Sequence, residues 1–221
     1  MDRWTRYTTA GVRGEDRPTD SLELGPGDVA GLDRRLLGDV SGLRVLDLGC
    51  GSGHGAIALA RAGARVVAID PDAAQITRAR RNAEEAETHV ELHNADLAEL
   101  AFLHADVFDA VVSVHALSGV SNLGRVFRQV HRVLKPERPL VFTLPHPASL
   151  TLHFDHPDTL VADYGDDTPL GEGPMLTHRH GIAHVFTTLM RSNYRVDTLV
   201  EPAGEGRFPA SVVFRARKLG T

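Results

Sequence analysis

The chain of 221 residues contains a single cysteine, Cys50, so it cannot form an internal disulfide. One thiol excludes the small secreted domains that disulfides hold together, and it fits a reducing compartment. No run of 18 apolar residues occurs, which argues against a transmembrane helix. The first 20 residues lack the apolar core of a signal peptide, so we expect a cytoplasmic protein without a membrane partner.

Positive charge is also scarce, because 24 Lys and Arg residues stand against 29 Asp and Glu, for a formal net charge of −5. The chain has no Lys/Arg run, whereas proteins that bind nucleic acid usually carry a basic patch. We therefore expect no nucleic-acid partner. The hydrophobic share of 42% is ordinary and sufficient for a large core, so we expect one domain over residues 1–221.

Apolar segments alternate with helical patterns through most of the chain. Strands are predicted at 43–48, 64–70, 89–96, 108–116 and 138–145, and helices at 29–37, 54–63, 72–87, 122–134 and 180–193. Two final strands, 195–202 and 209–217, are joined by a short connection and should be antiparallel. Such alternation is typical of an α/β fold with a doubly wound, Rossmann-like sheet.

Two segments break this alternation. Residues 1–27 are polar and rich in Gly and Pro, and we expect a loose N-terminal arm. In this arm, Trp4 and Tyr7 either close over a ligand or simply anchor the arm by packing. Residues 146–178 have no clear period, and a loop of this length inside a compact domain is usually functional or disordered. We expect this segment to act as a substrate lid.

The stretch RVLDLGCGSGHGAIALA, residues 44–60, joins an apolar strand to a helix through glycines at every second position. Glycines allow a sharp turn and a close ligand approach, and the helix start offers free N–H groups. In an open parallel sheet, ligands bind beyond the carboxyl ends of the strands. Gly51-x-Gly53-x-x-Ala56 also satisfies a dinucleotide fingerprint, so an NAD-dependent oxidoreductase is one alternative.

The longer string Asp47-Leu-Gly49-Cys50-Gly51-Ser-Gly53 resembles the glycine motif of class I S-adenosylmethionine (SAM)-dependent methyltransferases, above all the UbiE-like or type 11 small-molecule group. The resemblance implies a seven-stranded sheet of order 3-2-1-4-5-7-6 with strand 7 antiparallel. It also implies SAM as the cofactor and S-adenosylhomocysteine (SAH) as its product. An acid directly before the glycines suits a cationic ligand, whereas it would repel a pyrophosphate.

The resemblance further assigns cofactor contacts. Asp47 would lie beside the ammonium or sulfonium side of SAM, Asp70 would accept from the ribose hydroxyls, and Asp96 would accept from the adenine amino group. The other expected contacts are Gly49, Cys50, Gly51, Gly53, Pro71, Leu97, Ser113 and Val114. Ser118 and Gly119 replace an aromatic–imidazole pair that is frequent in the family, which leaves the substrate contacts open.

Methyl transfer requires alignment of the acceptor, and it requires a general base only when the acceptor must lose a proton. His146, directly after the fifth predicted strand, is the first candidate for this base, and His115 is the second. Tyr164, His153 and His156 are candidates of lower rank. The spacings His153-x-x-His156 and His180-x-x-x-His184 could serve a metal, but without a Cys pair or an H-E-x-x-H motif we expect none.

The sequence thus predicts a SAM-dependent methyltransferase that acts on an O, N or C atom of a small molecule, as a monomer or a homodimer. A non-catalytic SAM- or SAH-binding protein of the same fold and an NAD-dependent oxidoreductase remain alternatives. An aminopropyl transferase is disfavoured, because residues 113–119, SVHALSG, supply no acid to grip a polyamine. Methylation of RNA or protein also stays open, although the acidic balance of the chain disfavours it.

Overall fold

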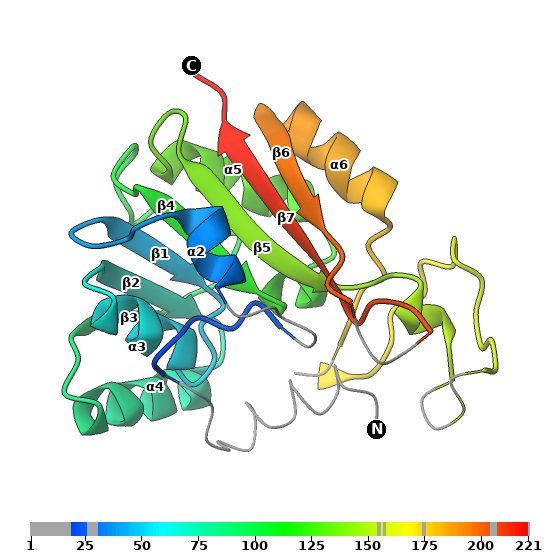
Figure 1. Ribbon diagram of the computed structural model, residues 1–221, viewed down its shortest axis with the longest axis horizontal. Helices are drawn as coiled ribbons and strands as arrows, with labels where there is room; N and C mark the ends of the chain where they lie inside the picture. The colour runs from blue at the N-terminus through cyan, green and yellow to red at the C-terminus, as the bar shows by residue number, and fades with distance from the viewer. Residues whose placement is uncertain are drawn as a thin grey trace.

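The computed structural model describes residues 19–25, 31–153, 156, 158–173, 176–203 and 207–220. These residues form a seven-stranded sheet with helices on both faces (Figure 1). Trp4 and Tyr7 lie outside the described residues, so their expected role stays a prediction. Among the described residues, no helix is both long and apolar enough to cross a membrane.

The sheet has the strand order β3-β2-β1-β4-β5-β7-β6, which confirms the prediction. The strands are β1 (Arg44–Leu48), β2 (Arg65–Asp70), β3 (Val90–Asn94), β4 (Ala110–Val114), β5 (Pro139–Pro145), β6 (Tyr194–Val200) and β7 (Ser211–Lys218). Strand β7 is antiparallel to both β5 and β6, and the other pairings are parallel. The fourth strand ends before residue 116, because the chain turns there into a short 3-10 helix.

The helices agree with the predicted pattern but are shorter at their ends. They are α2 (Leu32–Leu37), α3 (His54–Arg61), α4 (Ala73–Glu85), α5 (Leu123–Val133) and α6 (Ile182–Arg191), with 3-10 helices η1 (Ala116–Gly119) and η2 (Ser149–Thr151). The side chain of Asp72 accepts a hydrogen bond from the Ala74 N–H at 2.8 Å, so it caps α4. Helix α6 ends at Arg191 because Asn193 adopts a φ of 62° and turns the chain into β6.

Two apolar layers hold the helices to the sheet. Helices α5 and α6 pack on one face through residues such as Phe127 and Leu189, and α2 and α3 pack on the other through residues such as Leu36 and Leu59. Strand β1 contributes Leu46 to the first layer and Val45 to the second. A strand buried on both faces is typical of a parallel sheet, and its continuous apolar run is the pattern that the sequence showed.

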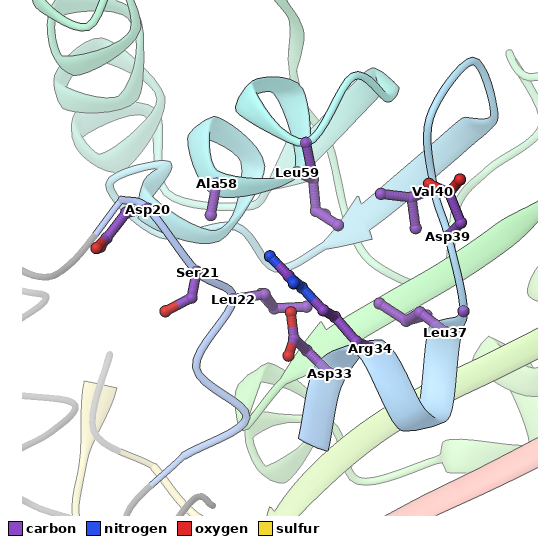
Figure 2. A pocket seen from close by; sticks show the side chains of 12 residues that line it. Asp20, Ser21, Leu22, Asp33, Arg34, Leu37, Asp39, Val40, Ala58 and Leu59 are labelled. Atoms are coloured by element: carbon purple, nitrogen blue, oxygen red, sulfur yellow. The ribbon is translucent and has the colours of Figure 1, made fainter. Parts of the chain in front are cut away.

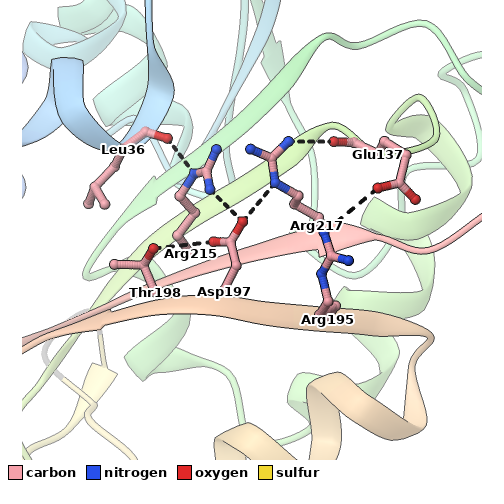
Figure 3. Close-up of polar contacts among 7 residues, drawn as sticks. All are labelled: Leu36, Glu137, Arg195, Asp197, Thr198, Arg215 and Arg217. Carbon is pink, nitrogen blue, oxygen red and sulfur yellow. Dashed lines mark hydrogen bonds and ion pairs between the residues drawn. The ribbon is translucent and has the colours of Figure 1, made fainter.

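A charged network occupies the sheet face over β6 and β7, next to α2 (Figure 3). Asp197 accepts hydrogen bonds from Arg215 and from Arg217, the latter at 2.7 Å. Burial acts to raise the pKa of Asp197, but the hydrogen bonds from the two arginines outweigh it and lower that pKa. The Arg215 Nε also donates to the Leu36 carbonyl at 2.6 Å, so the network fastens the last turn of α2 to the sheet.

Candidate functional site

Asp47 is a buried carboxylate at the centre of the candidate site. Its side chain is 3% exposed, and no described residue gives it a hydrogen bond or an ion pair. Burial, and after it the charge of Asp70, raise the pKa of Asp47 from 3.8 to about 7. A buried carboxylate without a partner is costly unless it takes up a proton or receives a cation. Asp47 is therefore the group in this site with the strongest need for a ligand.

Asp70 fastens the glycine turn to the end of β2. Its Oδ2 accepts from the Gly51 N–H at 2.8 Å, and its Oδ1 accepts from the Asp72 N–H at 2.9 Å. Burial raises the pKa of Asp70 as well. Each carboxylate oxygen has two lone pairs, so Asp70 keeps the capacity to accept two further hydrogen bonds. That capacity fits the predicted contact with a pair of ribose hydroxyls.

The three glycines of the turn have different reasons to be glycine. A Cβ on Gly49 would lie 2.0 Å from the Ala116 Cβ, and one on Gly53 would lie 2.9 Å from the Ala79 Cβ. Gly51 has a φ of 53°, and no described atom lies within 4 Å of where its Cβ would be. The outer two glycines thus let η1 and α4 pack closely, whereas Gly51 leaves space in which a ligand can approach the backbone.

The described part of the N-terminal arm, residues 19–25, lies over two predicted site residues. Leu22, 4% exposed, brings its Cδ1 within 3.0 Å of the position that a Cβ on Gly55 would take. That same position lies 3.4 Å from the Asp47 Oδ2. A Cβ on Gly25 would lie 2.2 Å from the His115 Nε2. The sequence indicated a polar and loose arm, and the short Leu22-x-Leu24-Gly25 pattern is the signal that could have indicated burial of this part.

The end of β4 borders the glycine turn. Ser113 is fully buried, and its hydroxyl donates to the Leu48 carbonyl at 2.6 Å, so it ties β4 to β1. Val114 is half-buried, and the contacts of both residues with a cofactor stay predictions. His115 has a φ of 62°, is 3% exposed, and places its Nε2 3.2 Å from the Ser211 Oγ. Such a backbone conformation is uncommon outside glycine and is often found at functional sites.

His146, directly after β5, has both ring nitrogens engaged. Its Nδ1 accepts from the Ala148 N–H at 3.2 Å, so its Nε2 carries the proton and donates to the Glu201 Oε1 at 2.9 Å. A general base needs a free nitrogen, so His146 could act as one only after one of these bonds breaks. Glu201, which the sequence analysis missed, joins the segment after β5 to the connection between β6 and β7.

The remaining predicted cofactor contacts lie along β2 and β3. Asp96 is exposed, and its Oδ1 accepts from the Ala98 N–H at 2.7 Å, while Leu97 beside it is buried. The Pro71 carbonyl accepts from the Asn94 Nδ2 at 2.9 Å, which links the ends of β2 and β3. Burial, and then the neighbouring carboxylates, raise the pKa of the Cys50 thiol, which opposes a catalytic thiolate. The roles of these side chains stay predictions.

The two histidine pairs with metal-like spacing form close ring contacts. The His153 and His156 rings stack with centroids 5.0 Å apart, and the His180 and His184 rings lie 6.3 Å apart. The His180 ring bonds to the Val120 carbonyl, and burial lowers the pKa of His180 to about 4. Within the described ranges, no group of three His, Cys, Asp or Glu side chains could hold a metal ion. Tyr164 is 53% exposed, so it is no part of the buried site.

Comparisons with known proteins agree with this geometry. Residues 45–137 match a family described as a methyltransferase domain. The crystal structure of an S-adenosylmethionine dependent methyltransferase from Mesorhizobium loti aligns with a TM-score of 0.72 and 28% identity, over 84% of this chain and 95% of that chain.

Two curated relatives match a shorter part of the chain. Both are called ubiquinone biosynthesis O-methyltransferase. The relative from Azorhizobium caulinodans is 35% identical over 106 residues, which is 48% of this chain and 42% of that protein. The relative from Hahella chejuensis is 35% identical over 121 residues, 55% of this chain and 50% of that protein. The chain thus spans half or less of the length of these two relatives.

Proposed function

We propose that this chain, which has the fold and the domain of the class I SAM-dependent methyltransferases, transfers a methyl group from SAM to a small molecule. The observation that carries this proposal is the buried carboxylate of Asp47, which no described residue pairs with, near Gly51, where no described atom fills the position of a Cβ. A ligand ammonium would neutralise Asp47. A dinucleotide would instead bring its negative pyrophosphate next to Asp47 and Asp70, which disfavours an NAD-dependent oxidoreductase.

The acceptor is proposed to be an O, N or C atom of a small molecule, with a hydroxyl oxygen tested first. The support for oxygen is the name O-methyltransferase that the curated relatives carry. We also propose a monomer or homodimer in the cytoplasm, without a nucleic-acid partner. The acidic balance of the chain supports the lack of a nucleic-acid partner, and the single cysteine fits a reducing compartment.

The protein's contribution to this reaction is binding and alignment. When bound, SAM supplies a methyl group that its sulfonium has already activated. Asp47 would hold the ammonium group, and Asp70 would accept from the ribose hydroxyls while its bond to the Gly51 N–H keeps the turn in place. Leu22, next to Asp47, excludes water and so strengthens the attraction between that carboxylate and a cation.

For a hydroxyl acceptor, we propose His115 as the general base ahead of His146, which reverses the order that the sequence favoured. His115 lies against Gly25, the next residue, Ala116, packs on Gly49 of the glycine turn, and the His115 Nε2 contacts the Ser211 hydroxyl. A hydroxyl can donate or accept, so Ser211 suits either protonation state of the ring. His146 has neither nitrogen available.

Isothermal titration with SAM, SAH and NADH tests the cofactor, with Asp70→Ala as the variant. We expect SAM and SAH to bind, NADH to give no heat, and Asp70→Ala to lose most of the affinity. Binding of NADH without SAM or SAH would overturn the proposal. A panel of small acceptors with SAH release as the readout then tests transfer. SAH binding without release from any acceptor would favour the non-catalytic alternative.

A further inference from the structure

A cavity of about 400 Å³ lies between α2, α3 and residues 20–22 (Figure 2). Its volume is in the range of small-molecule sites in proteins. None of the predicted cofactor or acceptor residues lines this cavity. It is therefore separate from the site described above, although it shares a wall with it.

Charged groups of both signs face this cavity. The Arg34 side chain extends between α3 and residues 20–22 in Figure 2, and its guanidinium has no hydrogen bond or ion pair with any described residue. Asp20 and Asp33 also line the cavity, and no described residue pairs with their carboxylates. The guanidinium can bind a carboxylate, and Asp33, which directly precedes Arg34 on α2, can bind an ammonium group. A ligand that can pair with groups of both signs is a zwitterion.

The floor of the cavity is apolar. Leu22, Val40 and Leu59 line it and are 4%, 6% and 3% exposed. Aliphatic side chains of this kind offer dispersion contacts but no hydrogen bonds, so they suit an aliphatic ligand body. The lining therefore combines an anion-binding group, cation-binding groups and an apolar surface.

Leu22 connects the two sites. It lines the cavity, and its Cδ1 also approaches Gly55 beside the Asp47 carboxylate. A molecule that packs against Leu22 in the cavity would hold the arm in place over Asp47. Two sites that share such a wall influence each other's affinity, and the influence is reciprocal.

We propose that this cavity binds a small amino acid with an aliphatic side chain. Its carboxylate pairs with Arg34, its ammonium group pairs with Asp33, and its side chain packs on Leu22 and Leu59. Occupation of the cavity strengthens SAH binding through Leu22.

The test uses the full chain without cofactor and three probes of the same carbon skeleton. L-leucine carries both charges, 4-methylpentanoate lacks the ammonium group, and 3-methylbutylamine lacks the carboxylate. We expect leucine to bind about tenfold more tightly than either singly charged probe in isothermal titration. Equal affinity for all three probes, or no leucine binding up to its solubility limit, would overturn the proposal.

Arg34→Gln and Arg35→Gln form a matched pair, because both residues lie on α2 and only Arg34 lines the cavity. We expect Arg34→Gln to weaken leucine binding about tenfold and Arg35→Gln to leave it unchanged. Equal losses of leucine affinity in both variants would contradict the proposal that Arg34 binds the leucine carboxylate. SAH affinity with and without leucine tests the coupling, and an unchanged affinity would refute it. Since leucine binding needs no SAM, its failure is distinguishable from failure of the proposed methyl transfer.

Discussion

At the carboxyl ends of β1 and β2, the buried Asp47 has no partner among the described residues, and no described atom lies within 4 Å of where a Gly51 Cβ would be. At the ends of β4 and β5, by contrast, the rings of His115 and His146 bond to Ser211 and Glu201. We call the first region the cofactor half and the second the acceptor half. In the cofactor half, no described residue neutralises the buried Asp47 carboxylate, and we propose that a charged ligand does so. Polar groups of the acceptor half instead hold segments of the chain together, so acceptor binding there has to displace or adapt to these bonds.

The largest expected effect is on cofactor affinity in Asp47→Asn. Removing one partner of a buried charge pair costs about 3–5 kcal/mol, so SAH affinity should fall on the order of a thousandfold. The matched control is Asp96→Asn, because Asp96 is exposed and already accepts from the Ala98 N–H. We expect less than about a tenfold loss there. Isothermal titration measures both affinities. Equal losses in the two variants would contradict the claim that the buried Asp47 contributes more to SAH binding than the exposed Asp96.

The same Asp47→Asn substitution should stabilise the protein without cofactor. The pKa of Asp47 is raised from 3.8 to about 7, so its protonated form stabilises the fold below pH 4 and this contribution is lost as pH rises towards 7. Asparagine resembles the protonated form at every pH. The gain should therefore grow between about pH 4 and 7, then level off at up to about 4 kcal/mol. Urea unfolding at several pH values checks this, and a pH-independent difference would refute it.

Gly25→Ala tests whether the arm positions His115. The new Cβ would lie 2.2 Å from the His115 Nε2, so the arm or the ring has to move. We expect kcat to fall about tenfold with SAH affinity changed less than about threefold. Gly31→Ala is the control, since Gly31 also has a positive φ of 80° but no described atom within 4 Å of the new Cβ. Equal effects in both variants would mean that backbone strain, and not contact with His115, causes the loss.

His146→Ala has the smallest expected effect on catalysis. The variant leaves the Ala148 N–H and the Glu201 carboxylate without their bonds to the ring, so the free energy of unfolding should fall by about 1–3 kcal/mol. We expect kcat to change less than about tenfold, whereas removing a general base costs about 10²–10⁴-fold. A loss of kcat in that higher range, without a loss of stability, would restore His146 as the base and place it above His115.

Local pattern explains why the fold could be predicted and why candidate residues for the cofactor half could be named. The apolar runs and the Asp47-to-Gly53 string each form one element or one turn, so the residues that carry the signal are neighbours in the chain. Strand order and the antiparallel β7 followed from the family resemblance and are confirmed. Asp47 and Asp70 lie together because their strands are adjacent in the sheet.

The acceptor half could not be predicted in the same way, because its contacts join distant parts of the chain. Glu201 bonds to His146 from 55 residues away, and Ser211 contacts His115 from 96 residues away. Gly25 reaches His115 from an arm whose polar composition indicated only a loose segment. No periodicity or motif spacing encodes such pairs. The position of a histidine directly after a predicted strand therefore indicated where it lies in the fold. It did not indicate which groups bond to the ring nitrogens.

The central claim is that the Asp47 carboxylate receives the cationic end of the cofactor, and the pH dependence of SAH binding tests it most directly. The pKa of Asp47 is about 7, so a cation has to displace a proton at lower pH. The dissociation constant of the native protein should rise about tenfold per pH unit below 7 and stay flat above it. In Asp47→Asn, this dependence should vanish and binding should be weak throughout. Tight SAH binding by Asp47→Asn, or the same pH dependence in both proteins, would contradict the account.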